Sequence, residues 1–318
     1  MNVVRFTHFS IRILNGANSL YANNRQQLAV TVEYIKTVNG VNTPLTTREL
    51  ESLQLVARDG EAMPDNWSSD QQHRGFDEGL WQSRSMADSS DGFVEGLEQQ
   101  VGPAAENSSV QFVTLFLRAR LNAESREFRA TVVIDELRRF YSDRDAGEPA
   151  VGNLFNSWIR AVSIAPYTLH AADLSHFIEV GHRGAGSGSS TAETIVHYWR
   201  LPSGLRVMQE IGSGGGRFQP PGLSLIWDSG RRLMFRITHT VSNLSVGQIR
   251  RYPHLNNQNV RLNNRPDLIR ACMDYIRSHP VGDWGRATSM VMIVDNFGCE
   301  HRFLLAQVDN NTISLTVG

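Results

Sequence analysis

The chain has 318 residues and a net charge of −1, with 41% hydrophobic and 20% charged residues. These values are typical of a globular protein with one large core or two of ordinary size, and the balanced charge argues against a protein that coats nucleic acid. Two cysteines are too few for a disulfide scaffold or a four-thiolate zinc site, and no apolar run approaches the length of a membrane helix.

Alternating apolar and polar residues predict β-strands in the first half of the chain. Residues 28–34 alternate strictly, and the Asn39-Gly40 pair that follows is typical of a hairpin turn. Two further alternating runs, 113–121 and 128–134, are separated by a short polar turn. We therefore predict a second hairpin formed by these two runs.

A long acidic segment, 63–109, separates the first strands from this predicted hairpin, and we expect it to be a functional loop. The charged stretch 135–149 ends in glycine and proline and is typical of a linker. These features predict an N-terminal β-sandwich-like domain over residues 1–145, with the domain boundary between about 140 and 165.

The second half repeats the alternation and predicts a C-terminal β-rich domain over residues 165–318. One helix is predicted within it, over 265–279, because Asn264 can cap a helix and Pro266 suits a first turn. Its apolar face would hold Leu268, Ile269, Cys272, Met273 and Ile276. The predicted fold is thus mainly β, with two β-sandwich-like domains, the second carrying one covering α-helix.

Potential metal ligands recur at intervals of three between residues 170 and 182. On a helix such residues share one face, and imidazole with carboxylate suits zinc or another transition metal. The alternative is a polar helix face without a metal. The candidate metal ligands are His170, Asp173, His176 and Glu179.

Catalytic residues and organic cofactors are not predicted. The chain has no Gly-x-Ser-x-Gly nucleophile motif, and its glycine-rich segments lack the lysine of a phosphate-binding loop.

Charge is segregated along the chain. Residues 61–108 hold ten acids against two arginines, whereas residues 200–286 hold thirteen arginines against five acids. This pattern favours contact between the two regions, within one molecule or between copies, although a solvated loop and an unrelated basic face are the alternative. The candidate partner-binding residues are Arg231, Arg232, Arg236, Arg250, Arg251, Trp199, Asp65, Asp70, Asp77 and Glu78.

Lys36 is the sole lysine among 31 basic residues. Arginine-biased codons would explain this, and so would selection against an acylatable amine in a host cytosol, as in lysine-poor toxins. We predict a non-enzymatic bacterial binding or assembly protein, a secreted or injected virulence or toxin-associated component. The alternatives are a structural component of a phage or contractile injection particle, and a metal-dependent effector enzyme that uses residues 170–182.

The expected partner is another protein, a further copy of the chain or a host-cell surface, and neither nucleic acid nor a membrane span is predicted. The first six residues lack the pattern of a Sec signal peptide. We therefore expect synthesis in the cytoplasm, followed by release or injection without signal cleavage.

Overall fold

The computed structural model describes residues 3–81, 110–134, 138–144, 155–185, 191–212, 224–228, 231–237, 263, 265–277, 288–308 and 313–318. The chain is mainly β, as predicted, and forms two compact units, Met1–Pro166 (unit 1) and Tyr167–Gly318 (unit 2). None of the helices in these ranges is long and apolar enough to span a membrane.

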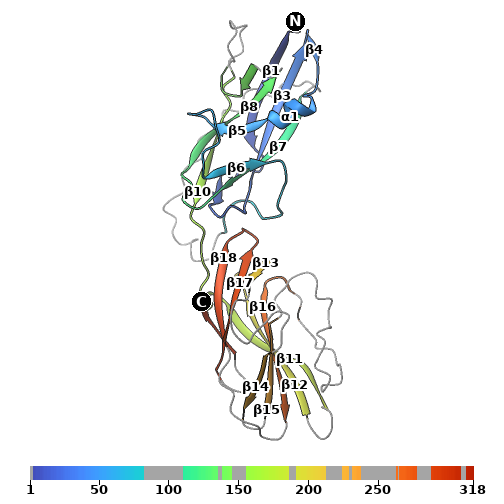
Figure 1. Cartoon of the computed structure of the whole chain (residues 1–318), viewed down its shortest axis with the longest axis vertical. Helices are drawn as coiled ribbons and strands as arrows, with labels where there is room; N and C mark the ends of the chain where they lie inside the picture. The colour runs from blue at the N-terminus through green and yellow to red at the C-terminus, as the bar shows by residue number, and fades with distance from the viewer. Residues whose placement is uncertain are drawn as a thin grey trace. The chain divides into compact units, whose positions relative to one another are not determined.

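The described residues of unit 1 form two five-stranded sheets and one short helix, α1 (Thr47–Ser52) (Figure 1). The first sheet has the order β1-β3-β7-β6, with β4 paired to β3. Its strands are β1 (Val4–Ile13), β3 (Leu28–Val38), β4 (Val41–Asn42), β6 (Trp67–Asp70) and β7 (Gln111–Ala119). The second sheet has the order β2-β10-β8-β5, with β9 paired to β8. Its strands are β2 (Ser19–Tyr21), β5 (Gln54–Ala57), β8 (Arg126–Ile134), β9 (Arg138–Tyr141) and β10 (Ile159–Ile164).

The two sheets of unit 1 share one apolar core. Val30 of β3 and Leu117 of β7 belong to the same buried cluster as Phe128 and Val132 of β8. Trp67 of the first sheet packs edge to face on Phe128 of the second, with ring centroids 4.9 Å apart. Each such side chain contributes about 1.5–3 kcal/mol by leaving water, so the alternating residues hold the sandwich closed.

The predicted turn at Asn39-Gly40 is confirmed. Both residues have positive φ, 51° and 83°, and they join β3 to β4 as an antiparallel pair. Positive φ at both central positions is what the tight hairpin turn requires, which explains the Asn-Gly sequence.

The predicted hairpin over residues 110–134 is wrong, although both of its strands form. β7 pairs with β3 and β6, whereas β8 pairs with β5, β9 and β10. The turn between them therefore carries the chain from one sheet to the other. Alternation identifies the face that each residue occupies but not the neighbouring strand, because both sheets bury one face against the same core.

The predicted loop 63–109 contains the strand β6, and its residues 82–109 lie outside the described residues. Trp67 fixes this strand, since its indole N–H donates to the Glu124 carbonyl at 3.0 Å. The predicted linker 135–149 likewise contains β9. Neither β6 nor β9 alternates between apolar and polar residues, so alternation did not predict them as strands.

The sole lysine of the chain is buried in unit 1. Lys36 is 4% exposed, and its Nζ lies 2.8 and 2.5 Å from the two carboxylate oxygens of Glu49. Glu49 also completes a capping box, in which its carboxylate accepts the Thr46 N–H at 2.7 Å. The ion pair therefore fixes the first turn of α1 to β3.

We expect Lys36→Met to lower the free energy of unfolding by about 3–5 kcal/mol, because Glu49 would remain as an uncompensated buried charge. Arg12→Met is the control: it breaks the exposed Arg12–Glu33 pair and should cost less than about 1 kcal/mol. Urea unfolding measures both. Equal losses in the two variants would contradict the buried pair.

The described residues of unit 2 form two antiparallel sheets. The larger has the order β11-β12-β16-β15-β14, and its strands are β11 (Ser175–Ala185), β12 (Thr191–Arg200), β14 (Ser224–Asp228), β15 (Arg231–Ile237) and β16 (Leu268–Arg277). The smaller has the order β13-β17-β18-β19, and its strands are β13 (Val207–Gly212), β17 (Thr288–Asp295), β18 (Glu300–Gln307) and β19 (Ile313–Val317). A single 3₁₀ turn, Ala171–Asp173, precedes β11.

The predicted covering helix over 265–279 is wrong. Most of this segment is β16, the central strand of the larger sheet, paired with β12 on one side and β15 on the other. Residues 268–271 are all at most 2% exposed, so both faces of the strand are covered there. A strand buried on both faces reads as a continuous apolar run, and a short run of that kind also fits helical spacing.

The turn between β17 and β18 is organised by Asp295, which is 0% exposed. Its Oδ1 accepts the backbone N–H groups of Phe297 and Cys299 at 2.8 and 3.0 Å. Its Oδ2 accepts from His301 Nε2 at 2.9 Å and from the Tyr167 hydroxyl. Four donors therefore compensate a carboxylate that has lost its water.

His301 extends this network to the start of unit 2. Its Nδ1 accepts the backbone N–H of Leu169 at 3.1 Å, so its single ring proton lies on Nε2, facing Asp295. Residues 167–169 are thereby fixed to the β17–β18 hairpin.

The predicted domains 1–145 and 165–318 stay a prediction, because compactness alone does not show that a unit folds by itself. We expect fragment 1–166 to fold without unit 2, since its core is complete within those residues. Its thermal transition should coincide with one of two transitions of the whole chain in calorimetry. A fragment without a cooperative transition would contradict independent folding.

Candidate binding surface

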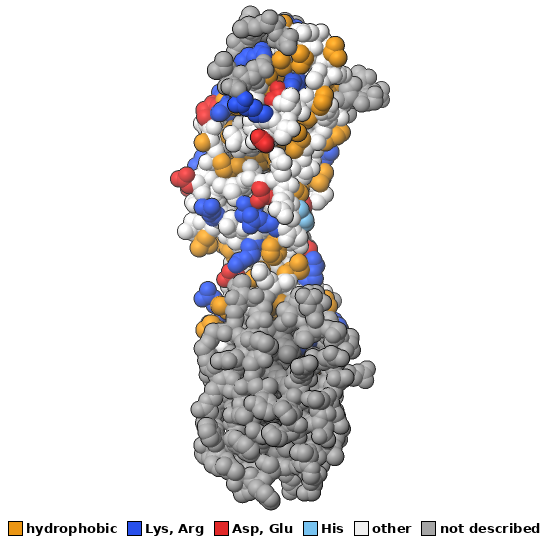
Figure 2. All heavy atoms as spheres, turned by 45° about the vertical axis from the view of Figure 1, so that its right-hand side comes forward, with side chains coloured by type: hydrophobic (Ala, Val, Ile, Leu, Met, Phe, Trp, Pro, Cys, Tyr) orange, Lys and Arg blue, Asp and Glu red, His pale blue; other side chains and the backbone are white. Residues whose placement is uncertain are grey.

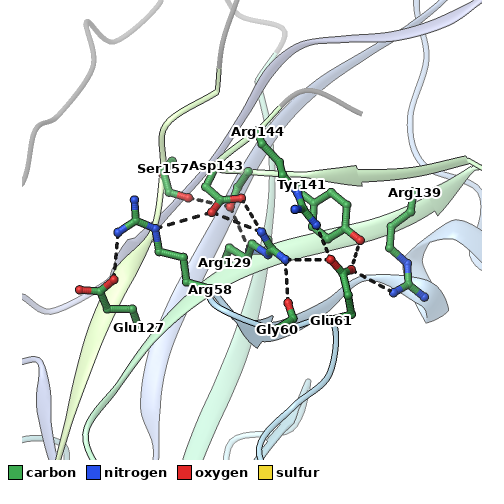
Figure 3. Close-up of polar contacts among 12 residues, drawn as sticks. Arg58, Gly60, Glu61, Glu127, Arg129, Arg139, Tyr141, Asp143, Arg144 and Ser157 are labelled. Atoms are coloured by element: carbon green, nitrogen blue, oxygen red, sulfur yellow. Dashed lines mark hydrogen bonds and ion pairs between the residues drawn. The ribbon is translucent and has the colours of Figure 1, made fainter. Parts of the chain in front are cut away.

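A cluster of charged side chains lies over β8, β9 and the turn after β5, with Arg129 at its centre (Figure 3). Arg129 is 3% exposed, and its guanidinium donates to the Gly60 carbonyl at 2.6 Å and to Glu61 at 3.2 Å. Its other terminal nitrogen, Nη1, donates to Asp143 at 3.2 Å. The same guanidinium lies over the Tyr141 ring, 4.4 Å from its centroid. These contacts fix three chain segments around one buried cation.

The Glu61 carboxylate is surrounded by arginine side chains and a tyrosine hydroxyl at the outer side of this cluster. It accepts hydrogen bonds from Tyr141, Arg144 and Arg129, and Arg139 lies 3.8 Å away. The Tyr141 hydrogen bond, followed by the Arg144 contact, lowers the pKa of Glu61 below its ordinary value. The cluster therefore binds a carboxylate at a position that is 55% exposed.

Arg58 links this cluster to a neighbouring hollow. It pairs with Glu127 at 2.9 Å and with Asp143 at 3.6 Å, and its guanidinium lies 4.3 Å from the Trp158 ring centroid. The hollow has a volume of about 390 Å³. It is lined by Arg58, Asp59, Ser125, Arg126 and Glu127.

Two serines attach the cluster to the rest of the sandwich. The Ser142 hydroxyl accepts the Ala130 N–H and donates to the Ser157 carbonyl, at 2.9 and 2.7 Å. The Ser157 hydroxyl in turn accepts the Ile11 N–H and donates to the Ile11 carbonyl. The edge of β1 is thus connected to the second sheet beside Asp143.

We call this region the arginine surface and define it as Arg58, Arg126, Arg129, Arg139, Arg144, Tyr141 and Trp158. Basic and acidic side chains lie interspersed on the visible face of unit 1 (Figure 2). Apart from Arg129, the arginine side chains are 36–48% exposed, so their guanidinium groups reach solvent. Such a surface can donate paired hydrogen bonds to carboxylates and stack on aromatic rings.

The predicted metal ligands do not share a helix face. His170 precedes the 3₁₀ turn and Asp173 ends it, and the Asp173 carboxylate accepts the His170 N–H at 2.7 Å. His176 and Glu179 lie on the strand β11, at positions that face opposite sides of the sheet. Within the described ranges, no three His, Cys, Asp or Glu residues gather as metal ligands. The helical spacing on which the predicted site depended is therefore absent.

Three of the five arginines predicted to bind a partner lie among the described residues. Arg231, Arg232 and Arg236 lie on β15, and Arg250 and Arg251 fall outside the described residues. Trp199, predicted to contact a partner, is only 4% exposed and stacks on His176 and His197. Trp199 is therefore an interior side chain of unit 2, and its predicted contact with a partner stays a prediction.

Among the predicted acidic candidates, Asp65 is exposed, whereas Asp70 and Glu78 are held by contacts within unit 1. Asp70 pairs with Arg118 at 2.9 Å, and Glu78 accepts from the Asn15 amide at 2.5 Å. Asp77 lies in the same loop, between them. This part of the acidic segment is thus already engaged in its own unit.

Two buried glutamines hold that loop against the sandwich. Gln26 donates to the carbonyls of Asp77 and Gly79 at 2.9 and 2.5 Å. Gln27 donates to Asp70 at 3.1 Å and to the Gln72 carbonyl at 2.8 Å. Both glutamines are at most 1% exposed, so the loop is attached by satisfied buried amides.

Sequence reasoning missed the arginine surface because its residues come from four separate segments. One local signal was present: the run Arg138-Arg139-Phe140-Tyr141, followed by Arg144, is rich in arginine and aromatic residues. Interfaces favour those residue types, but the glycine and proline that end the stretch 135–149 are equally typical of a linker.

No protein-family model and no curated protein sequence matches the chain. Among solved structures, it is similar to the C-terminal domain of the Streptococcus pyogenes antigen I/II-family protein AspA, with 8% identity, a TM-score of 0.24 and coverage of 98% of this chain and 99% of that one. The C-terminal domain of the Streptococcus agalactiae AgI/II polypeptide BspA gives 7%, 0.21, 98% and 100% in the same order. The collagen-binding domain of the Erysipelothrix rhusiopathiae surface protein RspB gives 10%, 0.16, 98% and 93%. TM-scores this low do not establish a shared fold.

We expect Glu61→Gln to lower stability at neutral pH by less than about 1 kcal/mol, as for exposed ion pairs. Because the pKa of Glu61 is lowered in the folded protein, its contribution is complete above the ordinary value of 4.5 and is lost as pH falls through the folded value. The melting-temperature difference between wild type and variant should therefore shrink in acid. An equal melting-temperature difference at neutral and at acidic pH would contradict the lowered pKa of Glu61.

Proposed function

We propose that the chain is a non-enzymatic binding protein whose unit 1 recognises an acidic protein segment through the arginine surface. The observation that carries the proposal is the way in which Glu61 is bound. Tyr141, Arg129 and Arg144 converge on its carboxylate, so the same cluster has the geometry to receive carboxylates from a partner.

Spare hydrogen-bond donors support this function. Each guanidinium has five N–H donors, and the contacts of Arg139 and Arg126 use few of them. Arg139 lies 3.8 Å from Glu61, and Arg126 pairs with Asp59 at 3.1 Å. An acidic segment would supply acceptors for the remaining donors.

The aromatic residues of the surface also support binding. Arg58 stacks on Trp158, and Arg144 lies 4.1 Å from the Tyr141 ring centroid. Stacking limits the rotamers of these arginines before a partner arrives, which reduces the entropy lost on association. Arginine, tyrosine and tryptophan are also the residues that most often carry binding energy in protein interfaces.

The buried state of Lys36 supports the proposed setting, a bacterial protein that meets a host. With its one lysine 4% exposed and paired with Glu49, the folded chain presents no lysine amine at its surface. Selection against acylation or ubiquitination in a host cytosol would produce that arrangement. We also propose that the protein is secreted or injected, that it acts in virulence and that it assembles with further copies of itself.

Poly-L-glutamate is a suitable probe, since it presents carboxylates without further specificity. We expect the whole chain to bind it. The double variant Arg139→Gln/Arg144→Gln should bind about tenfold more weakly, because charged hydrogen bonds are lost. Added salt should weaken binding by the wild type.

The matched control is Arg5→Gln/Arg12→Gln, which removes the same charge from β1 and should leave the affinity unchanged. Equal weakening in both double variants would show a response to net charge alone and would overturn the assignment to the arginine surface. Light scattering at low and high salt, on the same samples, tests self-assembly.

A further inference from the structure

Two histidines of unit 2 point a ring nitrogen at one another. His176 lies on β11 and pairs with Trp199, and His197 lies two residues before Trp199 on β12. The two histidines are therefore diagonal neighbours on one face of the sheet. His176 Nε2 lies 3.1 Å from His197 Nδ1.

The rings meet edge to edge rather than face to face. Their planes differ by 12°, and their centroids are 5.3 Å apart. That separation exceeds the 3.1 Å between the nitrogens by about the width of one imidazole ring, so the lone-pair positions of the two nitrogens face each other in nearly one plane. Without a ligand, one proton can lie between them, donated by one ring to the other.

Trp199 holds both rings in place. Its ring centroid lies 5.1 Å from that of His176 and 6.0 Å from that of His197, with interplanar angles of 23° and 21°. His197 is 1% exposed, whereas His176 is exposed. The pair thus combines a buried, positioned nitrogen with one that solvent can reach.

We propose that His176 and His197 together bind one divalent first-row transition metal ion, which replaces the proton between Nε2 and Nδ1. Neutral imidazole is a common ligand for Cu²⁺, Ni²⁺ and Zn²⁺, and the order of affinity for divalent ions places Cu²⁺ first. Water, or a side chain of a partner, would complete the coordination.

The distance between the nitrogens suits this role. Two nitrogens at the usual 2.0–2.1 Å from a tetrahedral metal are about 3.3 Å apart, close to the 3.1 Å between Nε2 and Nδ1. Because the two lone pairs face each other, each ring must also turn so that its lone pair points at the metal. The site keeps His176 of the predicted metal set and replaces the others with His197.

Equilibrium dialysis of the whole chain against Cu²⁺ and against Zn²⁺ tests the proposal, together with electron paramagnetic resonance of the Cu²⁺-loaded protein. We expect tighter Cu²⁺ than Zn²⁺ binding, and coupling of Cu²⁺ to two imidazole nitrogens. His176→Ala should weaken Cu²⁺ binding at least tenfold, and circular dichroism should show that this exposed substitution leaves the fold intact.

His170→Ala is the matched control, since it removes an exposed histidine six residues away that lies outside the pair. It should leave Cu²⁺ affinity unchanged. His197→Gln, which retains a polar side chain at the buried position, should abolish coupling to the second nitrogen. Unchanged Cu²⁺ affinity in His176→Ala, or equal losses in His176→Ala and His170→Ala, would overturn the site.

Discussion

The burial of the Arg129 guanidinium is the constraint on which the described surface of unit 1 depends. A cation taken out of water needs acceptors close by, and β8 alone cannot provide them because its own carbonyls belong to the sheet. The carbonyl of Gly60 and the carboxylates of Glu61 and Asp143 fill that need. The turn after β5 and the residues after β9 are therefore fixed to β8 by one side chain, and the outer arginines gather around the same carboxylates.

Three other buried charges among the described residues are compensated in different ways. Lys36 meets a single carboxylate, whereas Arg270, 1% exposed, donates to the carbonyls of Asn263 and Arg265. Asp295 accepts from four donors and needs no cation, since the ring proton of His301 lies on the nitrogen that faces it. Each solution joins segments that are separate in the sequence, so charges that cost free energy to bury also determine where loops and termini attach.

Alternation predicted the mainly β fold and the positions of strands such as β3, β7 and β8, because one residue in two faces the core of unit 1. It could not predict strand pairing, since β7 and β8 alternate in the same way whether they pair or face each other across a sandwich. It also failed for β16, which is covered on both faces and resembles a helix in its apolar spacing. Both predictions failed because strand pairing and the burial of a strand depend on tertiary contacts, which a local sequence pattern does not contain.

The candidate sites follow the same logic. The arginine surface unites residues of the turn after β5, of β8, of β9 and the turn after it, and of the segment before β10, and only the 138–144 stretch carries a local signal. The sequence predicts only one member of the histidine pair as a metal ligand, because His176 belongs to the series with a spacing of three. Its neighbour His197 lies 21 residues away and is brought to it by the β11–β12 register. Spacing along one element is informative only if that element forms. In a β-sheet the relevant distance runs across strands, so ligand pairs of this kind become visible once register is known.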